Sequence, residues 1–134
     1  MKKLILLLSV LALVFTSCSS DDDGGSQDPF IGTWKYIQYF EDDVEYPLEE
    51  CENQDTLVIS SNGTYNSTLY WDYGGGCEVD YQSSGTWENL SSGLYSTTDE
   101  DGDTYVQEVE FSGNTMYIVE VENGVTYKDV FMRQ

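Results

Sequence analysis

The chain has 134 residues and is strongly acidic, with 25 Asp and Glu, five Lys and Arg, no His, and a net charge of −20. Such a surface repels phosphate backbones, which argues against nucleic-acid binding and favours a soluble, monomeric domain. The absence of His removes the usual base of Ser and Cys nucleophiles, and no carboxylate pair stands in a distinctive context, so we expect no enzyme, no catalytic residues and no cofactor.

The first 17 residues have the pattern of an export signal. Lys2 and Lys3 form a positive start, residues 4–15 are an apolar run interrupted only by Ser9, and small residues follow. The run is too short to cross a bilayer as a mature anchor. We therefore predict that residues 1–17 are a signal peptide.

Cys18 indicates a lipoprotein signal, because Phe15-Thr16-Ser17-Cys18 resembles the bacterial lipobox, in which the Cys is lipidated. A structural Cys is the alternative. The acidic run at 19–23 resembles the signal that carries Bacteroidetes lipoproteins to the outer face of the outer membrane, although retention on the periplasmic side remains open. Residues 18–29 lack apolar residues after the Cys, except Pro29 at their end, and are predicted to be a flexible acidic tether.

A folded domain is expected over residues 30–134, built from strands and tight turns. Its turns are marked by Gly and Asn, an acidic turn is expected at 41–45, and no stretch has a helical period. The predicted strands cover residues 33–40, 56–60, 64–73, 77–88, 94–98, 104–111, 115–121 and 125–132.

A sheet of eight sequential strands would leave unpaired backbone groups at its edge strands, and an antiparallel up-and-down meander pairs them by closing into a barrel. An eight-stranded barrel can hold side chains or one small ligand. A two-sheet sandwich is the alternative. The fold class is therefore all-β, with little helix.

Cys51 and Cys77 remain once Cys18 is assigned to the lipid. In an oxidising compartment we expect them to form a disulfide, worth about 3 kcal/mol of stability. Metal ligation is the alternative, but without His or a second Cys pair the site would be incomplete. No metal site is predicted there. Asp99-Glu100-Asp101-Gly102-Asp103 resembles part of a Ca²⁺ loop, for which a solvated hairpin turn is the simpler interpretation.

The chain resembles the small lipocalin-like lipoproteins of Bacteroidetes. The features that carry the resemblance are the leader with Cys18, the acidic tether, Ile31-Gly32-Thr33-Trp34-Lys35, the remaining Cys pair and a second Gly-Thr-Trp at 85–87. Lipocalins begin their first strand with Gly-x-Trp, whose Trp packs across the barrel floor, which implies that role for Trp34. The resemblance also implies binding of a small apolar or amphipathic molecule.

Aromatic side chains are the candidate ligand contacts, because 14% of the chain is Phe, Trp or Tyr. The same side chains could instead fill a dry core, with the exposed loops of a surface accessory protein acting in glycan capture or envelope assembly. The candidates are Tyr36, Phe40, Tyr70, Trp87, Tyr105 and Phe111, and Trp34, Tyr36 and Phe40 are expected to share one face.

Overall fold

Antiparallel pairing runs from strand to strand along the whole computed structural model, which describes residues 26–134. The predicted signal peptide, Cys18 and most of the predicted tether lie outside the described residues. Within them, no helix is long and apolar enough to cross a membrane. The elements are β1 (Gly32–Glu41), β2 (Val44–Tyr46), a 3-10 helix η1 (Glu52–Gln54), β3 (Thr56–Ile59), β4 (Thr64–Asp72), β5 (Cys77–Ser91), β6 (Leu94–Asp99), β7 (Thr104–Ser112), β8 (Thr115–Glu122) and β9 (Val125–Arg133).

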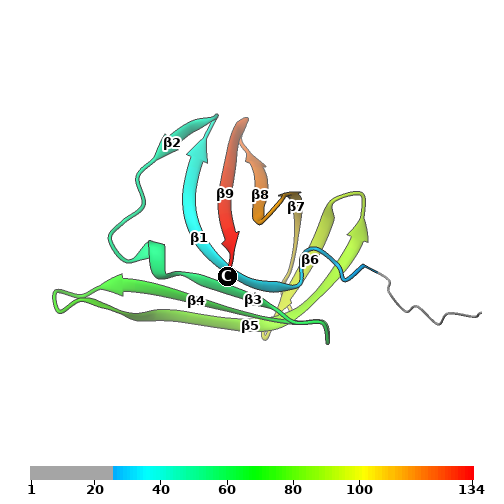
Figure 1. The fold of residues 1–134 in the computed structure, drawn as a ribbon, viewed down its shortest axis with the longest axis horizontal. Helices are drawn as coiled ribbons and strands as arrows, with labels where there is room; N and C mark the ends of the chain where they lie inside the picture. The colour runs from blue at the N-terminus through cyan, green and yellow to red at the C-terminus, as the bar shows by residue number, and fades with distance from the viewer. Residues whose placement is uncertain (1–25) are drawn as a thin grey trace, which may run out of the picture.

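The sheet closes because β9 returns to pair with β1. The register runs from Trp34 opposite Arg133 to Glu41 opposite Tyr127, and Figure 1 shows the two strands side by side. In addition, β1 pairs with β3, and each strand from β3 to β8 pairs with the one that follows it. Strands β1 and β3–β9 therefore form a closed, eight-stranded antiparallel barrel. This confirms the predicted fold and rules out the two-sheet sandwich.

The ninth strand, β2, was not predicted. It pairs with Tyr39–Glu41, whereas β3 pairs only with Gly32–Lys35, so the second half of β1 has β2 as its neighbour. The connecting turn is Asp42-Asp43, and both residues have positive φ angles, which Asp tolerates better than most side chains. The acidic turn is thus shorter than the sequence pattern indicated.

Trp34 closes one end of the barrel, as predicted. Its side chain is fully buried, and its indole Nε1 donates a 2.8 Å hydrogen bond to the Phe30 carbonyl oxygen. The Arg133 guanidinium lies 4.2 Å from the centre of the indole ring and donates to the carbonyl oxygens of Ile31 and Pro29. The first and last segments of the domain are therefore locked together at this end, which we call the closed end.

The second Gly-Thr-Trp packs against the same end. Trp87 contacts Phe30 edge to face, with ring centres 5.4 Å apart, and its Nε1 donates to the Ser60 carbonyl oxygen at 2.9 Å. Gly85 is required two residues earlier because a Cβ there would overlap the Thr98 carbonyl oxygen and the Tyr65 ring. The buried core at this end comprises Phe30, Trp34, Ile59, Tyr65, Tyr95, Val109, Met116 and Ile118.

Candidate functional site

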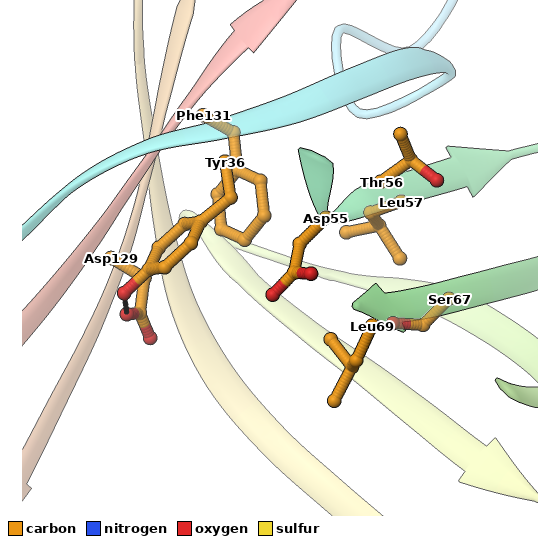
Figure 2. A pocket seen from close by; sticks show the side chains of 8 residues that line it. All are labelled: Tyr36, Asp55, Thr56, Leu57, Ser67, Leu69, Asp129 and Phe131. Carbon is orange, nitrogen blue, oxygen red and sulfur yellow. Dashed lines mark hydrogen bonds between the residues drawn. The ribbon is translucent and has the colours of Figure 1, made fainter. Parts of the chain in front are cut away.

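The barrel is not filled along its whole length. A cavity of about 200 Å³ lies between β1, β3, β4 and β9, and it opens to solvent at Leu69, which is 39% exposed. Leu57 on β3 stands opposite Ser67 on β4, and Leu69 is the next residue of β4 on the same face. Figure 2 shows the lining, which consists of Tyr36, Asp55, Thr56, Leu57, Ser67, Leu69, Asp129 and Phe131.

Asp55 is placed by the end of η1 and the start of β3. Its backbone carbonyl accepts the Tyr36 N–H at 3.0 Å, and its carboxylate Oδ1 accepts the Tyr70 N–H at 2.7 Å. Asp55 thus joins β1 to β4 where β3 no longer lies between them. The residue is only 8% exposed, and this burial raises the pKa of its carboxyl, as does the charge of Glu52, while the Tyr70 hydrogen bond opposes them.

A second carboxylate, Asp129, faces the cavity from β9. The Tyr36 hydroxyl donates a 2.6 Å hydrogen bond to its Oδ1, and the Tyr36 and Phe131 rings lie beside each other with centres 5.2 Å apart. Burial raises the pKa of Asp129, and Glu120 and Glu52 raise it further, against the lowering effect of the Tyr36 hydrogen bond. Burial and the Asp129 carboxylate also raise the pKa of the Tyr36 hydroxyl.

The predicted disulfide is present and supports this site. Cys51 and Cys77 are bonded, with Cα atoms 5.4 Å apart, and Cys51 is 2% exposed. Cys51 directly precedes η1, and Cys77 begins β5 opposite Asp72 of β4. The bond therefore holds the long loop after β2 against the β4–β5 hairpin, and it fixes Glu52 near the cavity.

The polar side chains of the lining are the two carboxylates and the hydroxyl groups of Tyr36, Thr56 and Ser67, and all of them can form hydrogen bonds with a bound molecule. Within residues 26–134, no group of three or more Cys, Asp or Glu side chains is arranged to hold a metal ion. In the acidic 99–103 turn, the Asp99 carboxylate accepts the backbone N–H groups of Asp101 and Asp103. That turn is thus organised by its own hydrogen bonds.

Residues 30–118 match the family of lipocalin-like domains. The chain belongs to this family. Among solved structures, this lipocalin-like chain is similar to the possum milk whey lipocalin trichosurin, solved with bound 4-ethylphenol, at 14% identity, 75% coverage of this chain, 73% of that one and a TM-score of 0.43. It is also similar to a de novo designed fluorescence-activating β-barrel, at 16% identity, with 78% and 94% coverage and a TM-score of 0.42. No curated protein sequence matches it.

A β-bulge in β1 divides the predicted ligand contacts. The register shifts between Tyr36 and Gln38, and beyond it Phe40 lies opposite Lys128, the neighbour of Asp129. Because Asp129 shares the inner face with Tyr36, Phe40 points outward. The prediction that Phe40 shares a face with Tyr36 is therefore wrong.

The other predicted contacts are spread over the barrel. Only Tyr36 lines the cavity, whereas Trp87 and Phe111 pack against the core of the closed end. Tyr70 donates its backbone N–H to Asp55. Because side chains alternate along β4 and the preceding Leu69 faces inward, the Tyr70 side chain points outward. Tyr105, on β7, is 54% exposed. The structure does not bring these aromatic side chains together into one site.

Sequence reasoning missed the two carboxylates. Asp129 had a usable signal, since it alternates with Tyr127 and Phe131 and so shares the inner face of a strand with aromatic residues. Asp55 had none. Its burial depends on β1 and β4 meeting across the end of β3, which is a tertiary contact.

Proposed function

We propose that this protein is a non-enzymatic envelope lipoprotein whose barrel binds one small amphipathic molecule. The observation that carries the proposal is the cavity, because Leu57, Leu69 and Phe131 offer apolar surface and Asp55, Asp129 and the Tyr36 hydroxyl offer fixed polar groups. A few convergent polar groups in a mainly apolar recess are typical of small-molecule sites. Membership in the lipocalin-like family is compatible with this function.

The remainder of the proposal rests on the leader. Cleavage before Cys18 and lipidation of that residue would anchor the protein in the outer membrane, with the acidic tether favouring display at the cell surface. The described chain enters the barrel through Pro29 and Phe30 at the closed end, whereas the cavity lies beside η1 and β3. A tether attached there would leave the cavity accessible.

Native mass spectrometry of the lipoprotein extracted from its own membranes tests the binding function. We expect a bound species of defined mass that disappears in Ser67→Phe, because the added ring fills the cavity. Asn66→Phe places the same ring on the opposite face of β4 and serves as the control. Retention of the bound mass in Ser67→Phe would contradict binding in this cavity.

A second candidate function is favoured by one surface feature. The β4–β5 hairpin, which Figure 1 shows extending beyond β3, carries the exposed aromatic residues Trp71, Tyr73 and Tyr81, between 45% and 66% exposed. Exposed aromatic patches mark docking surfaces for other molecules. An accessory protein that captures glycans through this hairpin would lose binding to a glycan array in Trp71→Ala and Tyr81→Ala, but retain it in Ser67→Phe.

A further inference from the structure

We infer that the ligand of this cavity is a cation: an ammonium group attached to a single aromatic ring or an apolar body of that size. This inference rests on the proposed function and names the class of molecule that the same site would take. It is carried by the unbalanced charge of the cavity, by its aromatic wall and by its volume.

Two carboxylates face the cavity without a cationic partner from the described chain. Asp55 is 8% exposed, and the Tyr70 N–H is the only donor from residues 26–134 to its side chain, through Oδ1. Figure 2 shows its carboxyl group directed into the space between the Tyr36–Phe131 pair and Leu69. Asp129 accepts one hydrogen bond, from Tyr36. Buried carboxylates are costly unless they are paired, so a bound ammonium would offset this cost.

The basic side chains of the described chain are engaged elsewhere. Lys128 pairs with Asp43, with Nζ and Oδ1 3.5 Å apart, and Arg133 lies over Trp34 at the closed end. Lys35 stands between Trp34 and the inward-facing Tyr36 on β1, so it points outward. Residues 26–134 therefore supply no cation to this cavity, and Glu52 adds a third negative charge near both carboxylates.

The aromatic wall complements this charge. The rings of Tyr36 and Phe131 stand 5.2 Å apart and inclined at 43°, on the side of the cavity that carries Asp129. An ammonium group is attracted to the face of an aromatic ring, and more strongly in a desolvated recess. A carboxylate pair beside aromatic faces favours a cation over a neutral hydroxyl and excludes an anion, which the net charge of −20 also repels at long range.

The volume limits the size of the ligand. An apolar cavity of about 150 Å³ is large enough to bind benzene. A cavity of about 200 Å³ therefore admits one ring and a short chain, with Leu57 and Leu69 as the apolar contacts. An arylalkylamine with two carbons between ring and nitrogen fits this description.

Three probes of similar size, which differ in the charge of their polar group, test the inference: phenethylamine, phenethyl alcohol and phenylacetate. Each is titrated calorimetrically into the lipoprotein extracted from its own membranes and placed in lipid nanodiscs, with empty nanodiscs as the blank. We expect phenethylamine to bind at least tenfold more tightly than the alcohol, and phenylacetate not to bind. Equal affinity for amine and alcohol would overturn the inference and leave the proposed function standing. Failure of all three probes to bind would overturn the inference, whereas the proposed function is contradicted only if Ser67→Phe retains the bound mass in native mass spectrometry.

Charge-removing variants locate the effect. Asp55→Asn and Asp129→Asn each keep an oxygen that can accept the Tyr70 or Tyr36 hydrogen bond, so both should retain the fold. We expect the preference for the amine over the alcohol to fall below threefold in the double variant. Asp103→Asn removes one charge in the exposed turn after β6 and should leave the preference unchanged. An unchanged preference in the double variant would show that the cation binds elsewhere.

Discussion

The Tyr36 hydroxyl donates a 2.6 Å hydrogen bond to Asp129 across the seam where the first strand of the barrel meets the last. Both side chains line the cavity, and the bond orients the Asp129 carboxylate. Tyr36→Phe should raise the pKa of Asp129 further, because it removes the one interaction that lowers it. A carboxyl titration by NMR measures this shift, and an unchanged or lower pKa would show that the hydrogen bond is not formed in solution.

The two cavity carboxylates should make stability depend on pH in an unusual direction. The pKa values of Asp55 and Asp129 are raised in the folded state, so the folded chain binds more protons than the unfolded chain between the ordinary and the raised pKa. Their contribution to the free energy of unfolding is therefore greatest below the ordinary carboxyl pKa and falls as pH rises through the raised values.

Thermal unfolding of the wild type and the Asp55→Asn/Asp129→Asn double variant checks this dependence. Subtracting the two curves isolates the pair from the many surface acids. We expect the double variant to gain melting temperature relative to wild type as pH rises from the ordinary carboxyl pKa through the raised pKa values of Asp55 and Asp129. A difference that is constant over this range would contradict the raised pKa values.

The Cys51–Cys77 disulfide should support both the fold and the cavity. Reduction, or the Cys51→Ala/Cys77→Ala variant, should lower the free energy of unfolding by about 3 kcal/mol, since the unfolded chain regains the entropy of the open loop. We also expect weaker ligand binding, because η1 and Asp55 follow Cys51 directly. Urea unfolding with and without a reductant measures this difference, and equal unfolding midpoints would refute the predicted stabilisation by the disulfide.

The second Gly-Thr-Trp offers a sharp test of packing. Gly85→Ala would drive a methyl group into the Thr98 carbonyl and the Tyr65 ring, and backbone cannot move aside easily, so we expect a loss of about 2 kcal/mol or more. Gly75→Ala is the matched control, because a Cβ there meets nothing within 4 Å. Calorimetric melting of both variants compares them. Equal melting temperatures would mean that β5 and β6 are less closely packed than described.

The strands of the barrel could be predicted from local signals, because turn-forming residues mark where one strand ends and the next begins. Asn123-Gly124, for example, forms the two-residue turn between Glu122 and Val125, with both residues at positive φ. Closure of the barrel could also be predicted, because an open meander of eight strands would leave unpaired edge strands. The cavity was harder to predict. The β1 bulge turns Phe40 outward without a Gly or Pro to mark it, and Asp55 becomes buried only when distant strands converge.

The β1–β9 seam has a consequence for how the protein folds. Every other strand pair in the barrel joins near neighbours in the chain, whereas this one joins its two ends, as Tyr36 and Asp129 are 93 positions apart. Contacts between distant residues require the most chain entropy to be lost before they form, so the meander should assemble first and the seam last. Because the cavity straddles the seam, a refolding chain would become able to bind only in this final step.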